Sequence, residues 1–162
     1  MRLTLHTDYA LRTLIFVGLR SGRLASIAEI AAAFRISENH LTKVVHGLGR
    51  AGFLDTVRGR GGGLRLARPP EAIRVGDVVR ATEEDLALVA CFAGADGLPS
   101  GGPCLIAGHC RLQSALAEAL AAFMAVLDGV TLAELLAPRQ EALRALLGLE
   151  APPPPLPQVS RA

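Results

Sequence analysis

The stretch SIAEIAAAFRISENHLTKVVHGLGRAGFL, residues 26–54, predicts two helices joined by a short turn. Ser26 is followed three residues later by Glu29, which is the spacing of a capping box, so we expect the first helix over 26–34. The turn RIS comes next, and Ser37 can cap a second helix over 38–54. Two short helices with about three residues between them are typical of the helix-turn-helix motif.

The second of these helices has an apolar face and a polar face. Its apolar residues recur at helical spacing and are expected to face inward: Leu41, Val44, Val45 and Leu48. The polar residues left outside, with the cap residue, form the candidate DNA-reading set: Ser37, Asn39, His40, Thr42, Lys43 and His46. An α-helix fits the major groove, where Asn can pair with adenine and Lys can donate to guanine. This face therefore predicts base recognition.

Residues 53–67, FLDTVRGRGGGLRLA, contain two short apolar runs around a turn of Arg and Gly. Glycines at 59 and 61–63 permit a tight reversal, so we expect a β-hairpin. Its candidate contacts to phosphates or to an adjacent minor groove are Arg58, Arg60, Gly61 and Arg65. A basic hairpin directly after a helix-turn-helix is a wing. The sequence therefore predicts a mainly α-helical protein whose residues 1–82 form a winged helix-turn-helix DNA-binding domain.

Two further helices complete this domain. The stretch TDYALRTLIFVGLRSG, residues 7–22, predicts a helix that Thr7 or Asp8 can cap and that Gly22 ends. Arg12 on this helix is expected to contact a DNA phosphate rather than a base. A short helix is expected near 75–82, after Pro69 and Pro70.

Composition and charge agree with a nucleic-acid partner. The chain has 162 residues, of which 51% are hydrophobic and 20% charged, which is ordinary globular composition. Residues 1–80 hold thirteen Lys or Arg and six Asp or Glu, a balance of +7, whereas residues 81–162 hold four and nine, a balance of −5. A basic first half favours a polyanionic partner, and the alternative is a solvated arginine-rich face. No signal peptide or membrane span is evident, so we expect a cytoplasmic protein.

The most regular helix is expected from residue 110 or 111 to about 128. Its apolar residues form a continuous seam about 28 Å long: Leu112, Ala115, Leu116, Ala119, Leu120, Phe123, Leu127 and Val130. The seam can pack on the chain's own domain, but we favour a homodimer, because helix-turn-helix proteins generally read two half-sites about a two-fold axis. Thr131 and Glu134 repeat the capping-box spacing before a last helical stretch that reaches Leu149. The proline-rich tail, 150–162, is expected to be disordered.

All three cysteines, Cys91, Cys104 and Cys110, lie in one stretch too rich in Gly and Pro for a helix or strand. Gaps of twelve and five residues fit poorly with the closely spaced pairs of a structural zinc site. A catalytic cysteine would need a partner and a pocket, and the adjacent His109 says little. A disulfide switch between Cys104 and Cys110 remains open. The interpretation we favour is ligation of an iron–sulfur cluster, which takes thiolates from irregular loops.

Four stretches resemble the Rrf-two family of winged-helix regulators over roughly residues 1–137. They are LTLHTDYALRTLIFVGL (3–19), ISENHLTKVVHGLG (36–49), RGRGGGLRLA (58–67) and CLIAGHCRLQSALAEALAAFMAVLDGVTLAELL (104–136), which holds the last two cysteines and the helix after them. The family is dimeric, with its long helices crossing. Its members that sense nitric oxide are the most similar.

The resemblance implies that Cys91, Cys104 and Cys110 bind an iron–sulfur cluster, 4Fe–4S in preference to 2Fe–2S. It also implies a fourth ligand from the first helix of the other subunit, and Asp8 stands at the matching place. Another branch of the family uses a His three residues past the last cysteine, where this chain has Gln113. GADGLPSGGP (94–103) looks like an insertion that lengthens the first gap, and His109 is a substitute ligand to consider. The competing role for Asp8 is capping its own helix.

By the same resemblance, the chain is a DNA-binding transcriptional repressor and not an enzyme. It would release its double-stranded operator when nitric oxide attacks the cluster. Alternatives are a family member that senses iron, oxygen or redox state, or a zinc- or disulfide-stabilised interaction module that does not touch DNA. The expected organisation is a DNA-binding domain (1–82), a cluster-binding loop (83–110), a dimerisation helix with C-terminal helices (111–149) and the tail (150–162).

Overall fold

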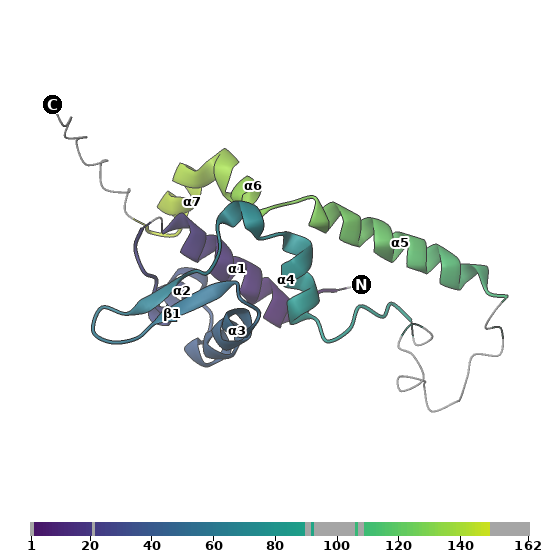
Figure 1. Ribbon diagram of the computed structural model, residues 1–162, viewed down its shortest axis with the longest axis horizontal. Helices are drawn as coiled ribbons and strands as arrows, with labels where there is room; N and C mark the ends of the chain where they lie inside the picture. The colour runs from purple at the N-terminus through teal and green to yellow at the C-terminus, as the bar shows by residue number, and fades with distance from the viewer. Residues whose placement is uncertain (1, 21, 90–91, 93–105, 107–108, 150–162) are drawn as a thin grey trace.

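The computed structural model describes residues 2–20, 22–89, 92, 106 and 109–149. Residues 5–66 form three helices and a two-stranded antiparallel hairpin: α1 (Leu5–Leu19), α2 (Ile27–Phe34), α3 (Glu38–Arg50), β1 (Leu54–Val57) and β2 (Gly63–Leu66). Helices α2 and α3 meet in a short turn, and the hairpin follows directly, as Figure 1 shows. The predicted winged helix-turn-helix is confirmed.

The cap of α2 lies where the sequence placed it. The Oγ of Ser26 accepts a hydrogen bond from the backbone N of Glu29 at 3.2 Å, and the carboxylate of Glu29 accepts one from the backbone N of Ser26 at 2.7 Å. The two bonds satisfy amide donors that the first turn of a helix leaves unpaired. The predicted capping box of Thr131 and Glu134 is also present.

The predicted cap of α1 is wrong. The helix begins at Leu5, and the Oγ1 of Thr4 accepts from the backbone N of Thr7 at 3.3 Å. Thr4 is as good an N-cap as Thr7, and it allows one more turn of helix. Asp8 therefore lies inside α1, where its backbone N donates to the carbonyl of Thr4, and it does not cap the helix.

Two helix ends also differ from the prediction. Helix α1 ends at Leu19 rather than at residue 22. Helix α3 ends at Arg50 rather than at residue 54, because Gly52 adopts a left-handed backbone (φ 73°) that turns the chain into β1. Leu54 consequently belongs to the wing.

The hydrophobic core is built around α1, which contacts α3, α4 (Val75–Thr82) and α6 (Leu132–Leu136). Ala10, Leu14 and Leu19 of α1 are almost fully buried. Other helices contribute further fully buried side chains: Ile30 from α2, Leu41, Val44 and Leu48 from α3, and Val78 from α4. The predicted inner face of α3 is therefore confirmed, and its burial fixes which side chains point outward.

The hairpin is joined to the helices at its base. The backbone N of Ala25 donates to the carbonyl of Leu64 at 3.0 Å, and the backbone N of Leu64 donates to the carbonyl of Ala25 at 2.7 Å. Ala25 lies just before the cap of α2. This bridge fixes the wing to the start of the helix-turn-helix.

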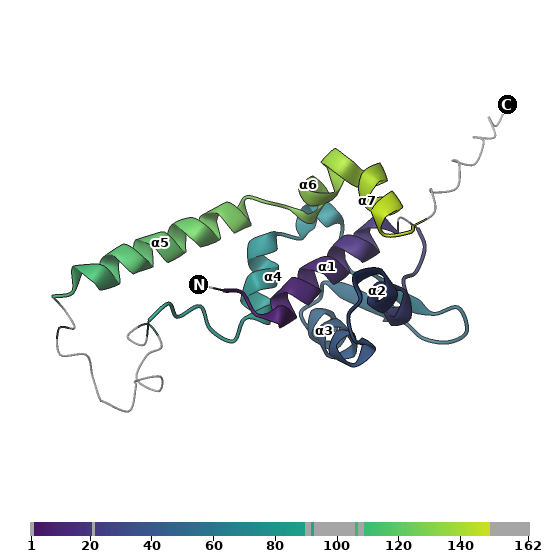
Figure 2. The same ribbon diagram turned by 180° about the vertical axis from the view of Figure 1, so that it is seen from behind.

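The long helix α5 (Arg111–Asp128) extends away from the winged helix-turn-helix, as both views show (Figures 1 and 2). Its C-terminal half contacts α4, where Met124 is buried next to Val79. Leu112, near the other end, is 64% exposed. Only part of the predicted seam therefore packs on the chain's own domain.

After α5 the chain returns to α1. The predicted last helix is divided into α6, a 3-10 turn at Ala137–Arg139 that contains Pro138, and α7 (Gln140–Leu146). Proline has no amide hydrogen to donate and interrupts the regular helix here. Among the described helices, none combines the length and the apolar character that crossing a bilayer requires.

Candidate nucleic-acid interface and cysteine segment

The outer face of α3 presents polar side chains to solvent. Asn39, His40, Thr42, Lys43 and His46 are all exposed, and so is Ser37 just before the helix. Ser37 occupies the N-cap position, but its side chain makes no cap hydrogen bond with the described residues. The Oγ1 of Thr42 donates back to the carbonyl of Glu38 at 2.8 Å, which leaves its methyl group and oxygen lone pairs on the outer face. The face therefore offers donors, acceptors and a methyl group, which is the chemistry that reads base edges.

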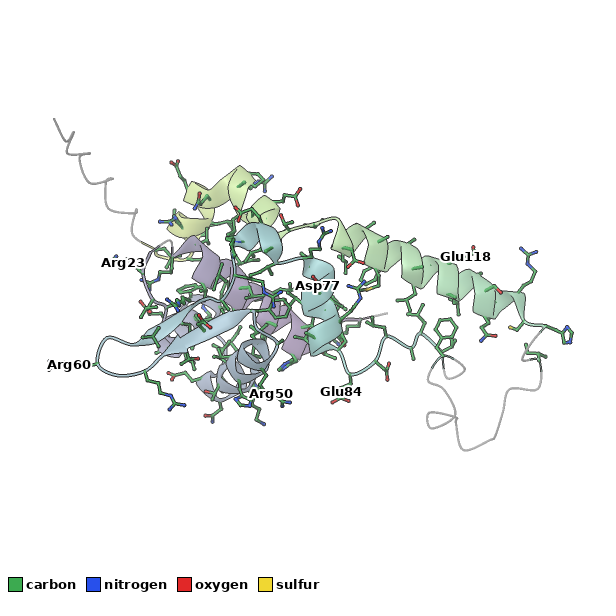
Figure 3. All side chains as sticks on the ribbon, viewed as in Figure 1. Arg23, Arg50, Arg60, Asp77, Glu84 and Glu118 are labelled. Atoms are coloured by element: carbon green, nitrogen blue, oxygen red, sulfur yellow. The ribbon has the colours of Figure 1, made fainter. Side chains whose placement is uncertain are left out.

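The wing carries two arginines on its exposed tip. Arg58 and Arg60 are exposed, and Figure 3 shows Arg60 at the end of the hairpin, away from the helices. The reversal depends on glycine: Gly61 has a φ of 80°, and a Cβ on Gly62 would lie 2.3 Å from the carbonyl oxygen of Val57. Neither position accommodates a side chain without a change in the turn.

The third arginine of the wing is already paired. Arg65 lies opposite Asp55 across the hairpin, and its guanidinium donates to the Asp55 carboxylate at 3.1 Å. Both side chains are exposed. The prediction grouped Arg65 with Arg58 and Arg60, but the structure places it on the strand rather than at the tip.

Arg68 supports the base of the wing, and the sequence analysis did not select it. Its guanidinium lies 4.8 Å from the ring centre of Phe53, and its Nε donates to the carbonyl of Gly52 at 2.9 Å. A cation stacked on an aromatic ring gains from the ring's negative face. The contact spans sixteen residues of sequence, so no local pattern identifies it.

Arg12 and Asp8 form an ion pair one turn apart on α1. The Nε of Arg12 donates to the Oδ1 of Asp8 at 2.9 Å, and both side chains are partly exposed. The Arg12 guanidinium also lies 5.8 Å from the ring centre of Phe34 at the end of α2. Tyr9, which follows Asp8 on α1, has its ring centre 6.4 Å from that of His40 on α3. The first turns of α1 thus lie beside both helices of the helix-turn-helix.

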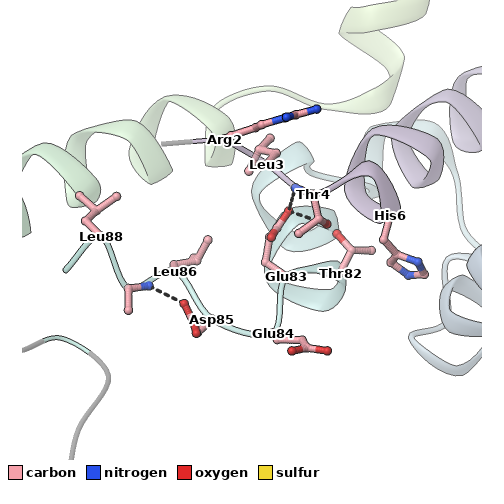
Figure 4. A pocket seen from close by; sticks show the side chains of 11 residues that line it. Arg2, Leu3, Thr4, His6, Thr82, Glu83, Glu84, Asp85, Leu86 and Leu88 are labelled. Atoms are coloured by element: carbon pink, nitrogen blue, oxygen red, sulfur yellow. Dashed lines mark hydrogen bonds between the residues drawn. The ribbon is translucent and has the colours of Figure 1, made fainter. Parts of the chain in front are cut away.

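Glu83, the first residue of the predicted cluster-binding loop (83–110), is hydrogen-bonded to the start of α1 (Figure 4). Its Oε1 accepts hydrogen bonds from the backbone N of Thr4 at 2.8 Å, from Thr4 Oγ1 at 3.1 Å and from Thr7 Oγ1 at 2.5 Å. Burial acts to raise the pKa of Glu83, but the hydrogen bonds from Thr7 and Thr4 outweigh it and hold the pKa below its ordinary value. The acid stays ionised and fixes residue 83 to the helix that carries Asp8.

These groups line a pocket of about 740 Å³ between the start of α1, the end of α4 and residues 84–88. His6 lies on its α1 side, and Glu84 and Asp85 lie on the other (Figure 4). Three carboxylates and one guanidinium, that of Arg2, line the pocket, so acidic groups outnumber basic ones here, in contrast to the wing. Sequence reasoning missed Glu83 because its partners lie more than seventy residues away.

Cys110 is the one predicted cysteine ligand that the structure describes, since Cys91 and Cys104 lie outside the described residues. It precedes α5 at the N-cap position, and its thiol is partly exposed. This end of α5 is the one farthest from α1 in both views (Figures 1 and 2). Within the described residues, no three His, Cys, Asp or Glu side chains lie close enough together to hold a metal ion. The structure thus does not bring Cys110 and Asp8 of one chain together.

Fold and exposed basic surface together define a winged helix-turn-helix DNA-binding protein. The profile of the Rrf2 family, described as an iron-dependent transcriptional regulator, matches residues 3–138. This chain belongs to the Rrf2 family of transcriptional regulators. Transcriptional regulation through DNA binding, in the manner of a repressor, follows from this membership.

Three known proteins illustrate the similarity. The chain is 52% identical to the HTH-type transcriptional regulator NsrR of Geobacillus kaustophilus, over 91% of this chain and 97% of that protein. It is 46% identical to NsrR of Bacillus subtilis, over 90% of this chain and 97% of the relative. Among solved structures, T. potens IscR superposes with a TM-score of 0.68 at 25% identity, covering 88% of this chain and 90% of that one. Sequence and structure therefore agree on the family.

Proposed function

We propose that this protein is a homodimeric repressor that holds an iron–sulfur cluster and releases its operator when nitric oxide damages the cluster. Two copies of α3 would occupy successive major grooves, and the wings would contact the backbone or the adjacent minor groove. Cys91, Cys104 and Cys110 of one subunit and Asp8 of the other would hold the cluster. The similarity to two NsrR proteins over nine-tenths of the chain supports this choice of signal.

The DNA half of the proposal rests on how the charges are distributed. The side chains that face outward from α3 and the wing tip include Lys43, Arg58 and Arg60, whereas the carboxylates of Glu83, Glu84 and Asp85 line a separate pocket beside the start of α1. Phosphate contacts provide affinity and position, and the polar side chains of α3 provide sequence selection. Residues 1–82 would therefore bind DNA, and residues 83–110 would respond to the signal.

The donor set fits a cluster. Thiolates are soft ligands that suit iron–sulfur chemistry, and a carboxylate is a harder ligand that iron holds less firmly. Cys110 has a partly exposed thiol at the start of α5, and the Asp8 side chain is 41% exposed on α1. The bound cluster would supply an iron atom that nitric oxide can attack. That the first turn of α5 lies far from α1 within one chain is the observation that favours a site shared between two subunits.

Asp8 then connects the cluster to DNA binding through Arg12. In the structure its carboxylate neutralises the Arg12 guanidinium at 2.9 Å. An Asp8 engaged elsewhere leaves Arg12 available for a DNA phosphate. The loss of that engagement returns Asp8 to Arg12 and withdraws a positive charge from the DNA. The chain's own residues thus offer a two-position switch.

The test begins with full-length protein purified without oxygen. We expect stoichiometric iron and acid-labile sulfide, broad visible absorbance, and weaker binding to DNA selected from a random pool once nitric oxide is added. Cys110→Ser should lose the iron, while Ser114→Ala, an exposed position one turn further along α5, should keep it. A protein that contains no iron and binds the selected DNA equally with and without nitric oxide contradicts the proposal. If iron depletion or oxygen releases the DNA and nitric oxide does not, the result supports the proposed cluster but contradicts nitric oxide as its signal.

A mixing experiment tests the shared site. In a dimer of one Cys110→Ser chain and one Asp8→Ala chain, ligands borrowed from the partner leave one complete site, whereas ligands from the same chain leave none. We expect mixed dimers to bind about half the iron of the wild type, and neither parent variant to match them. Equal iron in mixed and parent dimers contradicts the shared site.

A further inference from the structure

The last residue of α5 is held to α4 by a two-pronged ion pair. The guanidinium of Arg80 donates from its two terminal nitrogens to the two carboxylate oxygens of Asp128, at 2.7 and 2.6 Å. The two residues are 48 positions apart and lie on different helices. Because a guanidinium and a carboxylate are both planar, two parallel hydrogen bonds fix their orientation as well as their distance.

The backbone around Asp128 is fixed from other directions too. Arg74 donates to the carbonyl oxygen of Asp128 at 2.7 Å. The backbone N of Val75 donates to the carbonyl of Val130 at 2.9 Å, and the backbone N of Leu132 donates to that of Ile73 at 2.8 Å. The end of α5 therefore cannot rotate without breaking hydrogen bonds to both sides of the start of α4.

Glycine 76 allows this close approach. A Cβ at this position would lie 1.9 Å from the Oδ1 of Asp128 and 3.1 Å from its backbone N. Gly76 lies inside α4, where alanine is ordinarily favoured by up to about 1 kcal/mol. Its presence there is explained by the space that the Asp128 carboxylate needs.

Arg80, Asp128 and Gly76 together form the joint between α4 and α5. The other end of α5 is far from this joint. Eighteen residues at 1.5 Å each give a helix of about 27 Å. A rotation of about 10° at Asp128 moves the far end by about 5 Å, which exceeds the rise of about 3.4 Å per base pair. Leu112 at the far end is 64% exposed, so this part of α5 is not packed on the winged helix-turn-helix through that side chain.

We propose that Arg80 and Asp128, seated against Gly76, are positioning residues that fix the angle between α5 and the winged helix-turn-helix. In a dimer joined through α5, this angle sets the separation of the two recognition helices and hence the half-site spacing that the protein accepts. The inference rests on the proposed dimer and operator, but not on the cluster or on nitric oxide.

The test measures spacing preference with full-length, anaerobically purified protein. Wild-type protein first selects duplexes with two half-sites from random DNA. The spacer of the selected duplex is then lengthened or shortened by one base pair, and a duplex with a single half-site is prepared as a reference. A wild type that is monomeric or selects no paired half-sites contradicts the proposed function itself, before any variant is made.

We expect the wild type to prefer the selected spacing by about tenfold over either altered spacer. Arg80→Ala and Asp128→Asn should reduce that preference to below about threefold and leave affinity for the single half-site unchanged. Arg80→Lys keeps the charge but loses the planar fork, so its preference should lie between these values. Asp77→Asn is the matched control, because Asp77 contacts the same guanidinium at 3.5 Å from within α4 and does not reach α5.

Gly76→Ala adds a methyl group where the Asp128 carboxylate lies, so it should disturb the same joint and also broaden the spacing preference. Should this variant fail to fold, Asp128→Asn still decides the matter, because it preserves the shape of the side chain. The proposal is overturned if Arg80→Ala and Asp128→Asn keep the wild-type spacing preference, or if they weaken single half-site binding as much as paired binding.

Discussion

Asp8 and Arg12 form a 2.9 Å ion pair on the exposed side of α1, and the Arg12 guanidinium reaches to within 5.8 Å of the ring centre of Phe34 in the helix-turn-helix. An acidic residue that the family resemblance assigns to a metal centre is thus the immediate electrostatic partner of a candidate phosphate contact. Whatever takes the Asp8 carboxylate away changes the charge that the first helix presents to DNA.

In the cluster-loaded protein, where Asp8 is engaged elsewhere, removal of Arg12 should weaken DNA binding without changing its sequence preference. A phosphate contact contributes a salt-dependent term of about 0.9 per charge to the slope of log K against log salt. Arg12→Ala in a dimer should therefore lower the slope by about two and reduce affinity for operator and unrelated duplex by similar factors. Salt titrations by fluorescence anisotropy measure both quantities. Arg139→Ala, an exposed cation after α6, is the control and should leave the slope unchanged.

Asn39 should behave in the opposite way. It lies on the exposed face of α3 and can pair with an adenine edge in two positions. Asn39→Ala should cost about 1–3 kcal/mol on the selected operator and nearly nothing on unrelated DNA. Competition binding against single-base operator variants locates the base concerned. A loss that is equal on all duplexes would assign Asn39 to the backbone instead.

Two arginines of the wing should differ in their effect on DNA binding. Arg60 lies at the exposed tip, whereas Arg65 is paired with Asp55 at 3.1 Å. A paired guanidinium has to give up its partner before it can contact DNA, and an exposed pair contributes only about 0–1 kcal/mol to stability. Arg60→Ala should therefore weaken operator binding more than Arg65→Ala, and both variants should melt within a few degrees of the wild type. The reverse order would place the DNA on the strands of the hairpin.

Ser26 and Ser37 occupy equivalent positions before α2 and α3 but have different surroundings. Ser26 completes a capping box, whereas the Ser37 side chain makes no cap hydrogen bond to the described residues. Ser26→Ala should lower the free energy of unfolding by about 1 kcal/mol, within the range of about 0.5–2 for such caps, and Ser37→Ala should lower it by less. Denaturant melts measure the difference. If Ser37→Ala weakens DNA binding while its stability is unchanged, the hydroxyl faces the DNA.

The joint at Asp128 should weaken in acid. The hydrogen bond from Arg80 holds the pKa of Asp128 below its ordinary value, and hydrogen bonds from Thr131 do the same for the pKa of Glu134. A carboxyl group whose pKa is lowered by folding stabilises the folded state above its unfolded pKa of about 4, and that contribution is lost as the pH falls through the folded value. The melting temperature of the wild type should therefore fall more steeply below pH 4 than that of Asp128→Asn. Parallel curves would show that the ion pair contributes nothing to stability.

Local patterns were sufficient to predict most helices, and long-range contacts were not. The capping boxes at Ser26 and Thr131 were predictable because each depends on residues only three positions apart. The start of α1 was not, since Thr4 and Thr7 are chemically equivalent caps and the choice is made by tertiary contacts. One such contact is the bond from Thr4 to Glu83.

In the candidate site, too, some residues were predictable from local patterns and others depend on long-range contacts. The exposed face of α3 followed from helical periodicity, because burial of Leu41 and Leu48 determines which side chains face outward. Glu83, Arg68 and the pair of Arg80 with Asp128 show no local signal, because their partners lie sixteen to seventy-nine positions away. Residues that couple one part of the protein to another are therefore the ones that only a structure identifies.

The hydrogen-bonded bridge between Ala25 and Leu64 fixes the base of the hairpin to the helices, and residues 58–62 at the tip lie beyond this bridge. Insertions, deletions or charge changes at that tip can accumulate without tilting the helices beneath it. During evolution, a duplicated gene could in this way acquire a different promoter preference through its loop alone, while the folded core and its signal response are inherited intact.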